Sequence, residues 1–364
     1  MLKTLIFGAG AIGRGFLAPI LSKAGIEIDF VDKDKDLLKN FFGRHTYSTA
    51  VIEDSGYMLQ TVHFGHAFGI DNVHQINHYN AVFISVGPRN CLNLRRFIDD
   101  AKTVFILEND WHTYEILRKS ATNSEVYFGI PDVITSNTSP PELLYDDPLC
   151  VVSEKGSLLL EDDRHHLNLG TDIKFFERQA LSRHWNCKFF IHNACHAVVA
   201  YLGAIYSHRY VHQAMADDRI GPLVENAMKT VTQALIAADR AGEKPALAYM
   251  ARELKRFQNP FLFDPITRVA RDPFRKLHYN DRLVKALYLV KKTDLDPYPF
   301  LVAIRAAMEY QGISEDDIRF IKYRKLYHPS EILRRVCAMH DEELIQKIMD
   351  IDPYDHSGKS SKSS

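Results

Sequence analysis

The sequence predicts an α/β domain with a parallel sheet, followed by a mainly α-helical domain. In the first half of the chain, short apolar runs alternate with helix-like segments, as strands do when crossover helices connect them. From about residue 186, apolar residues recur at helical spacing and strand-like runs almost disappear. The 364 residues are enough for two buried cores. We expect the first domain at 1–184, the second at 185–356 and a disordered polar tail at 357–364.

The elements of each domain follow from these patterns. In the first domain we expect strands at 2–7, 26–31, 80–87 and 103–107. A helix is expected at 12–24, and the polar segment 145–180 is expected to hold closing strands and loops. In the second domain we expect helices at 187–204, 209–241, 243–256, 280–291, 298–310, 315–323, 329–338 and 341–350.

Composition and charge argue against several classes of function. A net charge of -1 provides no global basic field of the kind that binds nucleic acid or membrane surfaces, although a local basic patch stays open. No apolar run approaches the roughly 18 residues of a membrane span, and the glycine-interrupted N-terminus does not look like a secretory signal. The five scattered cysteines form no Cys-x-x-Cys pair, and no cluster has zinc-ligand spacing. We expect a cytoplasmic protein with no metal and no nucleic-acid or membrane partner.

A glycine-rich run, GAGAIG at 8–13, joins the first predicted strand to the first predicted helix. In a G-x-G-x-x-G run of this kind, Gly8 allows a tight turn, Gly10 lets the backbone approach a pyrophosphate, and Gly13 lets helix and strand pack closely. The free N–H groups and positive end of the helix attract phosphates. In this strand–turn–helix context, the run predicts a Rossmann-like domain that binds a dinucleotide.

An acidic residue, Asp32, ends the next predicted strand about 20 residues after the glycine run. A carboxylate there can accept both ribose hydroxyls and would repel a 2′-phosphate, which favours NAD over NADP. Lys33 next to it could contact a 2′-phosphate, and a glycine turn without cofactor or an FAD protein would show the same run. The expected cofactor-binding residues are Gly8, Gly10, Ala11, Ile12, Gly13 and Asp32.

Four segments spread over most of the chain resemble one dehydrogenase family. They are FGAGAIGRGF at the start, Glu108-Asn109 after a strand, KFFIHNACHA at 188–197 continuing into AYLG, and RFQNPFLFDPITRVARDPFRKL at 256–277 with NDRL after it. The third fits the pattern K-x-x-x-x-N-x-x-H. On these residues, and over roughly 1–350, the sequence resembles the polyol-specific long-chain dehydrogenases. The resemblance implies NAD-dependent, metal-free oxidation of a polyol or sugar phosphate, foremost mannitol 1-phosphate, or reduction of the matching ketose.

The resemblance also assigns roles to four side chains. Lys188 would be the general base, Asn109 and Asn193 would donate to the developing oxyanion, and His196 would orient substrate hydroxyls. An ammonium has a reference pKa near ~10.4, so it needs burial or a nearby cation to act as a base near neutral pH. Neutral amides stabilise an oxyanion without competing for protons. Taken singly, each side chain could equally be an ordinary helix, core or turn residue.

Helical geometry brings these residues together only in part. On an α-helix Lys188, Asn193 and His196 fall at about 0°, 140° and 80°, which is one broad face. Lys188 would lie about 12 Å along the axis from His196. It must therefore lean towards the site or precede the regular helix.

The segment 256–283 is rich in basic residues, which suit a phosphate. The family places substrate contacts here, and Arg268 and Lys276 are the candidates. The alternative is a solvated face with ion pairs to Asp264, Asp272 and Asp281.

Two segments depart from the family pattern. The family has V-D-R where this chain has Thr135-Ser136-Asn137, and Asp132 is the acid that could compensate. NTGH has become NACH at 193–196. These changes keep open an unphosphorylated polyol or sugar acid as substrate, and a catalytically impaired NAD-binding relative. A ketopantoate-reductase-like protein also starts GAGAIG, but the longer helical domain and the K-x-x-x-x-N-x-x-H spacing argue against it. The resemblance implies a monomer, and no obvious heptad seam contradicts this expectation.

Overall fold

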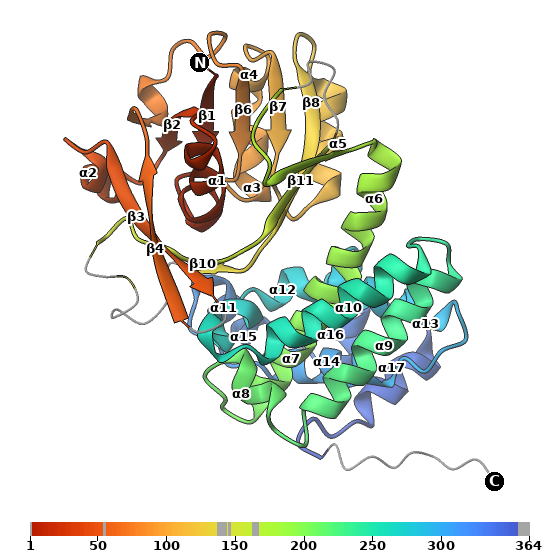
Figure 1. The fold of residues 1–364 in the computed structure, drawn as a ribbon. Helices are drawn as coiled ribbons and strands as arrows, with labels where there is room; N and C mark the ends of the chain where they lie inside the picture. Colours follow the sequence, from red (N-terminus) through yellow and green to blue (C-terminus); the bar gives the residue numbers. More distant parts are fainter. Residues whose placement is uncertain (1, 54–55, 137–143, 145–146, 162–166, 356–364) are drawn as a thin grey trace. The chain divides into compact units, whose positions relative to one another are not determined.

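The computed structural model describes the chain except for residues 1, 54–55, 137–143, 145–146, 162–166 and 356–364. Asn137 and the tail predicted at 357–364 therefore lie outside the described residues. The chain forms two compact units, Met1–Ser182 and Arg183–Ser364. The first contains the sheets and the second is helical (Figure 1), so the fold class predicted from the sequence is confirmed. Within the described part of the chain, no helix is long and apolar enough to cross a membrane.

The first unit is built around an eight-stranded sheet in the order β12-β11-β8-β7-β6-β1-β2-β5. All neighbouring strands are parallel except β8 and β11, which pair antiparallel. The strands are β1 (Lys3–Phe7), β2 (Glu27–Asp32), β5 (Ala67–Gly69), β6 (Ala81–Ile84), β7 (Thr103–Ile106), β8 (Glu125–Asp132), β11 (Ser157–Glu161) and β12 (Ile173–Phe176). The four strands predicted from apolar runs are confirmed as β1, β2, β6 and β7.

Burial on both faces explains why the central strands read as apolar runs. Every residue of β6 and β7 is buried, and Phe83 of β6 stacks on Phe105 of β7 with ring centroids 5.2 Å apart. Aspartates begin two of the connecting helices: Asp34 accepts hydrogen bonds at the start of α2, and Asp110 does so at the start of α5. The helical segments of this unit are the π-helical η1 (Gly13–Leu17), α1 (Ala18–Lys23), α2 (Lys35–Phe41), η2 (Ile70–Asn72), α3 (Pro88–Cys91), η3 (Leu92–Leu94), α4 (Arg95–Ile98) and α5 (Trp111–Ser120).

A second, four-stranded sheet was not predicted. Its order is β4-β3-β10-β9, and its strands are β3 (Thr46–Glu53), β4 (Gly56–His63), β9 (Thr135–Ser136) and β10 (Val152–Glu154). Strands β3 and β4 form a long antiparallel hairpin. The sequence TYSTAVIE of β3 is rich in β-branched and aromatic residues, which is the signal that could have revealed it.

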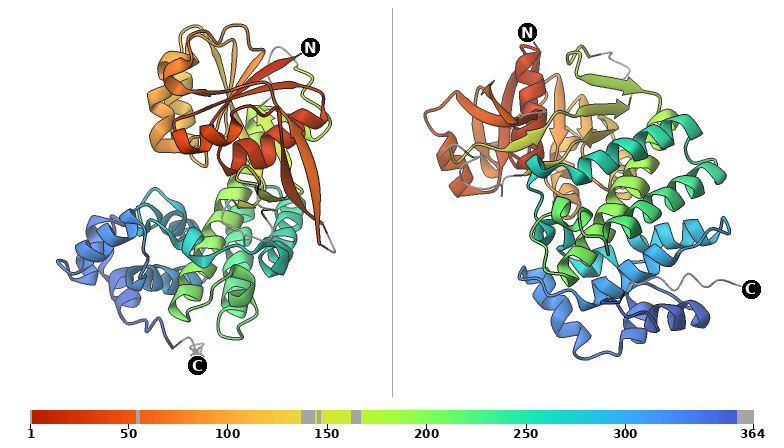
Figure 2. Two further views of the ribbon diagram at one scale, coloured as in Figure 1. Left: turned by 90° about the vertical axis from the view of Figure 1, so that its left-hand side faces the viewer. Right: turned by 60° about the horizontal axis from the view of Figure 1, so that its bottom comes forward.

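The second unit is a bundle of helices (Figure 2). Its central helix, α7 (Cys195–Ile205), packs against α8, α9, α11 and α14. Residues Cys195 to Gly203 of α7 are all buried, as expected for a helix that is apolar on every side. The other helices are α6 (Arg178–Asn186, which continues from the first unit), η5 (Cys187–Ala194), α8 (Val211–Met215), α9 (Gly221–Ala237), α10 (Glu243–Gln258), η6 (Pro260–Leu262), α11 (Ile266–Ala270), α12 (Pro273–Lys276), α13 (Arg282–Lys291), α14 (Tyr298–Glu309), α15 (Glu315–Arg324), α16 (Pro329–Arg335) and α17 (Glu342–Met349).

The prediction of one helix over 209–241 was wrong, because the chain breaks between α8 and α9. Asp217 accepts hydrogen bonds from the backbone N–H and the guanidinium of Arg219, which favours a turn. Gly221 then approaches the carbonyl of Met215 so closely that a Cβ would collide with it. The Gly-Pro pair that opens α9 is a helix-start signal inside a segment that otherwise looks helical.

Candidate active site

The glycine run forms the turn between β1 and η1 that the sequence predicts. Gly8 has φ +97°, and a Cβ there would collide with the carbonyl of Ser85 at the end of β6. A Cβ on Gly13 would meet the carbonyl of Gly8, whereas one on Gly10 would meet nothing within 4 Å. Gly8 and Gly13 are therefore needed for the turn itself, and Gly10 leaves an open backbone face. Ala11 and Ile12 follow at the start of the helix, where free N–H groups suit a phosphate.

Two side chains hold the backbone of one loop residue, Ala9, through its N–H and its carbonyl. Asp32 Oδ2 accepts the N–H of Ala9 at 2.8 Å, and Arg14 Nη1 donates to the carbonyl of Ala9 at 3.1 Å. Asp32 Oδ1 accepts the N–H of Asp34, and a carboxylate has further lone pairs for ribose hydroxyls. Arg14 is only 5% exposed, and its main-chain carbonyl accepts the hydroxyl of Tyr47 at 2.6 Å. We did not predict a role for Arg14, although it lies inside the run FGAGAIGRGF.

The Glu108-Asn109 pair follows β7 at the same edge of the sheet as the glycine turn. Glu108 is buried, and its Oε1 accepts the N–H groups of Val86 and Gly87 at 2.7 and 2.8 Å. Burial raises the pKa of Glu108 to about 7, although these two hydrogen bonds oppose the shift. Asn109 is exposed. Glu108 thus fixes the backbone after β6, while Asn109 is presented to solvent at the carboxyl ends of the strands, where α/β proteins bind ligands.

The segment with Lys188, Asn193 and His196 is not a regular α-helix. Residues Cys187–Ala194 form the π-helix η5, and α7 continues from Cys195. In a π-helix the hydrogen bonds join residues five apart, so Lys188 and Asn193 lie about one turn apart along the helix. This wider turn is the physical reason why the angles expected for an α-helix do not apply here. Lys188, Asn193 and His196 are 5%, 5% and 7% exposed, so all three functional groups are buried polar groups.

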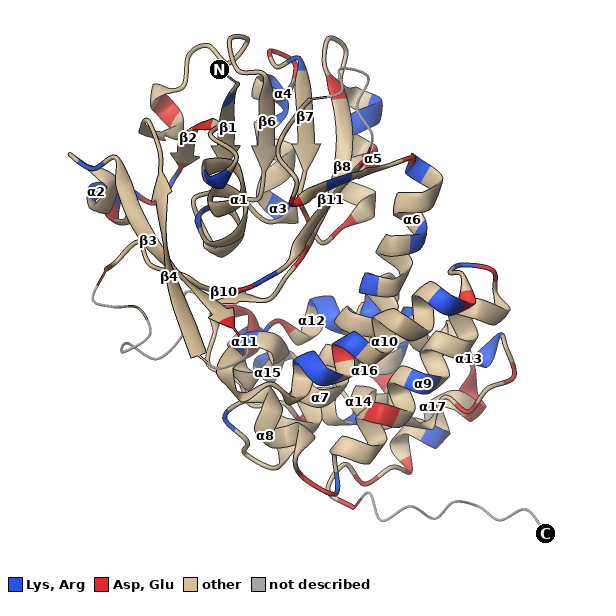
Figure 3. Ribbon diagram, viewed as in Figure 1, with Lys and Arg blue, Asp and Glu red and all other residues tan. Residues whose placement is uncertain are grey.

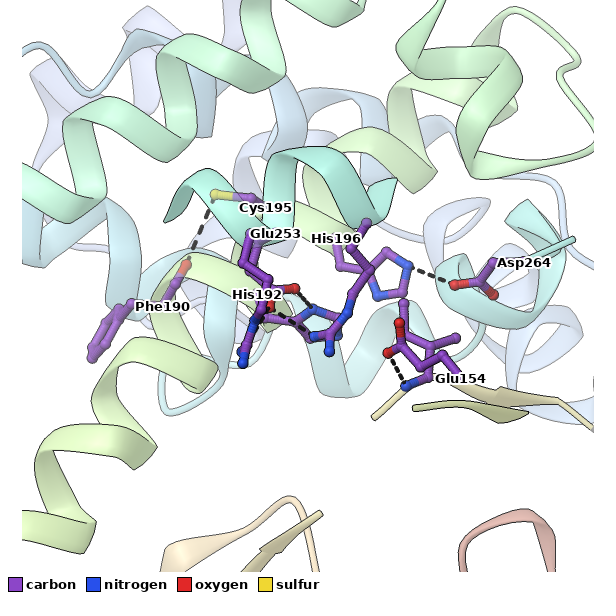
Figure 4. A network of polar contacts seen from close by, with 10 residues as sticks. Glu154, Phe190, His192, Cys195, His196, Glu253 and Asp264 are labelled. Carbon is purple, nitrogen blue, oxygen red and sulfur yellow. Dashed lines mark hydrogen bonds and ion pairs between the residues drawn. The ribbon is translucent and has the colours of Figure 1, made fainter. Parts of the chain in front are cut away.

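His196 belongs to a buried chain of charged groups (Figure 4). Its Nε2 lies 2.8 Å from Asp264 Oδ2, within ion-pair distance but without the angles of a hydrogen bond. Arg268 donates to Asp264 Oδ1 from Nε at 2.9 Å and from Nη2 at 2.5 Å. Burial opposes the charge of Asp264, but Arg268 and His196 hold its pKa below the usual value. The ring of His196 also stacks on Phe257, so its orientation is fixed from two sides.

A second histidine, which we did not predict as functional, lies one turn earlier. His192 Nδ1 is 2.6 Å from Glu253 Oε2, and Arg256 donates to Glu253 Oε1 at 2.7 Å (Figure 4). Burial lowers the pKa of His192 to about 4. Burial opposes the charge of Glu253 too, but His192 and the arginines Arg256 and Arg252 hold its pKa below the usual range.

The two predicted substrate residues lie in different surroundings. Arg268, on α11, is engaged by Asp264, which is one of the ion pairs left open as an alternative. Lys276 ends α12, whose last turn holds the basic residues Arg275 and Lys276 (Figure 3). Lys276 is buried, and its Nζ donates to the carbonyl of Arg271. Burial and repulsion from Arg275 and Arg282 hold the pKa of Lys276 well below its usual value.

The segment that replaces V-D-R is also described in part. Thr135 and Ser136 form β9 and are buried against β10. Asp132, the acid that could compensate, is buried at the end of β8. Thr135, Ser136 and Asp132 are therefore all shielded from solvent. A compensating role for Asp132 stays a prediction.

Taken together, a dinucleotide turn backed by an acid at the end of β2 and a helical unit with buried lysine, asparagine and histidine define a dinucleotide-dependent oxidoreductase. Two family models match the chain, "Mannitol dehydrogenase Rossmann domain" over residues 2–110 and "Mannitol dehydrogenase C-terminal domain" over residues 181–353. The chain belongs to the mannitol dehydrogenase family. It is therefore a polyol dehydrogenase, an oxidoreductase, which confirms the family that the sequence resembled.

Individual relatives extend this similarity over the chain. A mannitol-1-phosphate 5-dehydrogenase of Caldanaerobacter subterraneus subsp. tengcongensis is 27% identical over 389 positions, which cover 96% of this chain and 97% of the relative. Two solved structures share the fold. The Pseudomonas fluorescens mannitol 2-dehydrogenase, in a ternary complex with NAD and D-mannitol, has a TM-score of 0.72 at 15% identity, covering 97% of this chain and 89% of the other. A D-sorbitol dehydrogenase has a TM-score of 0.70 at 14% identity, covering 96% and 92%.

Proposed function

We propose that this protein interconverts D-mannitol 1-phosphate and D-fructose 6-phosphate by hydride transfer with NAD. The observation that carries the catalytic part is the amide of Asn193. Its Nδ2 is buried, and it has no hydrogen-bond partner among the described residues. An unsatisfied buried donor costs stability, so its retention beside the buried Lys188 and His196 supports a role in binding substrate.

The cofactor is NAD. The family's Rossmann domain matches residues 2–110, and the Pseudomonas fluorescens relative holds NAD in its complex. The residues present fit this cofactor, because Gly10 leaves the backbone open and Asp32 ends β2 without a basic residue in its place. When bound, NAD supplies the acceptor or donor of the hydride. Asp32 would hold its ribose, and Gly8, Gly10, Ala11, Ile12 and Gly13 would hold its pyrophosphate.

The residues of the chain would then carry the proton and the charge. Lys188 Nζ takes the hydroxyl proton during oxidation of the alcohol and returns it during reduction of the ketose. Asn193 Nδ2 donates to the oxygen as negative charge develops on it, and Asn109 is the second candidate donor. His196 is held in one orientation, because its Nε2 faces Asp264, and it forms a hydrogen bond with a neighbouring substrate hydroxyl.

The preference for a phosphorylated substrate has separate support. The relative from Caldanaerobacter subterraneus subsp. tengcongensis is a mannitol-1-phosphate 5-dehydrogenase. In this chain, burial lowers the pKa of Lys276, and repulsion from Arg275 and Arg282 lowers it further. Within the described part of the chain, Asp272 and Asp281 pair with the two arginines but not with the lysine, so a phosphate would bring Lys276 the negative charge that it lacks. Lys276 is therefore the better phosphate candidate, while Arg268 acts on substrate through Asp264 and His196.

The direct test offers the purified protein fructose 6-phosphate, fructose and fructuronate in turn, with NADH and then NADPH. Loss of reduced-nicotinamide absorbance is the readout. We expect oxidation of NADH with fructose 6-phosphate only. Turnover of fructose or fructuronate in its place would reassign the substrate to a neutral polyol or a sugar acid. Binding of NADH without turnover of any of the three would refute the proposed reaction.

The phosphate site has its own test. Lys276→Met should raise the KM for fructose 6-phosphate at least tenfold, which is the effect of losing one charge-assisted contact. Arg268→Met should lower turnover of any ketose, phosphorylated or not, because Arg268 acts on the substrate through Asp264. If Lys276→Met raised the KM for fructose as much as the KM for fructose 6-phosphate, the phosphate assignment would be contradicted.

A further inference from the structure

Two histidines lie on the catalytic segment, residues 188–196, and each is in contact with a buried carboxylate. His192 faces Glu253 and His196 faces Asp264, and the two rings lie with centroids 4.9 Å apart (Figure 4). Each carboxylate is in turn paired with an arginine. The family pattern K-x-x-x-x-N-x-x-H specifies only the second histidine and leaves the position of His192 open. His192 is thus an additional imidazole in this chain, one turn from the expected one and next to Asn193.

The partners of His192 determine which of its nitrogens carries the proton. Glu253 is ionised, because Arg256 and Arg252 lie against it, and an ionised carboxylate only accepts hydrogen bonds. The neutral imidazole must therefore place its proton on Nδ1, which lies 2.6 Å from the carboxylate. Its Nε2 then carries a lone pair. No hydrogen bond to Nε2 is present in the described part of the chain, and this atom is not among the fully buried ones.

His196 has the opposite arrangement, because its Nε2 is the nitrogen that faces a carboxylate. The two rings therefore offer different nitrogens from neighbouring positions. A polyol or open-chain ketose carries hydroxyls on successive carbons, and each hydroxyl hydrogen needs an acceptor once it leaves water. Two fixed acceptors at this spacing can bind two hydroxyls of one such substrate.

We propose that His192 is a second substrate-positioning residue, which accepts a hydrogen bond from a substrate hydroxyl through Nε2 while Glu253 holds its other nitrogen. This rests on the proposed function, because it assumes that the polyol or ketose lies beside Asn193 and His196. It adds to that function a contact that the family pattern does not specify. The substrate class is a chain with hydroxyls on neighbouring carbons.

The test separates a substrate contact from a structural role. His192→Leu removes both the acceptor and the bond to Glu253, and should raise the KM for the ketose about three- to tenfold, the effect of one neutral hydrogen bond. Its affinity for NADH should not change. His192→Gln keeps an amide N–H for Glu253 and an oxygen for the hydroxyl, and should restore the KM to within about twofold of the parent protein.

The matched control is His208→Leu. His208 forms a comparable pair with Asp217 at 2.9 Å in the same unit but outside the catalytic segment. This variant should lower the melting temperature without changing KM. An equal rise in KM for His208→Leu, or an unchanged KM for His192→Leu, would overturn the proposal.

A binding experiment tests the His192 contact separately from the proposed reaction. With NADH bound, nitrogen NMR of the histidine side chains should show His192 protonated at Nδ1. Addition of fructose 6-phosphate, or of fructose if only that is turned over, should shift the Nε2 signal. If fructose is the substrate, the phosphate assignment fails while the His192 contact can still hold. If no ketose shifts the His192 signal, the His192 contact is wrong even where turnover is normal.

Discussion

The cofactor turn of the first unit and the catalytic segment of the second both fix polar groups, but they use different parts of the chain. In the turn, the backbone is the proposed binding surface, and the side chains of Asp32 and Arg14 hold the N–H and the carbonyl of Ala9. In the catalytic segment, the side chains are the proposed binding surface, and buried carboxylates hold His192 and His196. The turn should therefore be sensitive to added volume, and the catalytic segment to lost charge.

Removal of the proposed base should have the largest effect of all. Lys188→Met should lower kcat by about 10³-fold, because general base catalysis commonly contributes between ~10² and ~10⁴. NADH affinity, measured by fluorescence titration, should stay within about twofold of the parent protein, since the dinucleotide turn lies in the other unit. A kcat within about tenfold of the parent would remove Lys188 from the mechanism.

The two glycines of the turn should separate stability from binding. A Cβ on Gly13 would collide with the carbonyl of Gly8, so Gly13→Ala should lower both the melting temperature and NADH affinity, the latter by about 100-fold or more. A Cβ on Gly10 meets nothing within 4 Å in the protein but would stand where the pyrophosphate approaches. Gly10→Ala should therefore weaken NADH binding with an unchanged melting temperature. Identical behaviour of the two variants would contradict the proposed geometry of the turn.

Loss of charge should be costly in the catalytic segment. Asp264→Asn leaves Arg268 and His196 without their shared anion in a site where Asp264 is 3% exposed, and should lower the free energy of unfolding by about 3–5 kcal/mol. The KM for the ketose should rise as His196 loses its fixed orientation. Chemical denaturation and steady-state kinetics check the two effects. The matched variant Asp217→Asn should lower stability and leave KM unchanged.

The same contrast explains what could be predicted from the sequence. The three glycines lie within six residues between one strand and one helix, so Gly8, Gly10 and Gly13 could be placed from a local pattern, although the contact of Gly8 with Ser85 could not. The partners of the histidines could not, because Glu253 is 61 residues from His192 and the pair forms only when α10 packs against η5. The π-helical turn at Lys188 was missed for a related reason. Its wider spacing leaves no periodic signal in a segment that is buried on nearly all sides.

Errors in the fold have local causes as well. The break between α8 and α9 is signalled by Gly221-Pro222, but the apolar spacing on both sides suggested one helix. The hairpin β3–β4 has a strong β-branched strand, but β4 has many exposed positions and reads as polar. Apolar runs thus predicted the central strands β1, β2, β6 and β7, whereas β4 has exposed polar positions among its apolar ones and gave no such signal.

The smallest expected effect lies at the edge of the first unit, where Glu108 titrates. Its pKa in the folded protein is about 7, above the ordinary carboxyl value, because burial disfavours the charge. The folded protein therefore binds this proton more tightly than the unfolded chain does. Stability from this group is greatest below the ordinary carboxyl pKa and falls as the pH rises towards 7.

Glu108→Gln removes this titration while its side-chain oxygen can still accept the N–H groups of Val86 and Gly87. Between about pH 5 and about pH 8, the free energy of unfolding of the parent protein should fall relative to that of the variant by on the order of 2 kcal/mol. Denaturant unfolding of both proteins at several pH values measures this difference. Parallel curves would show that Glu108 is ionised throughout, in which case the two backbone N–H groups outweigh burial at this end of β7.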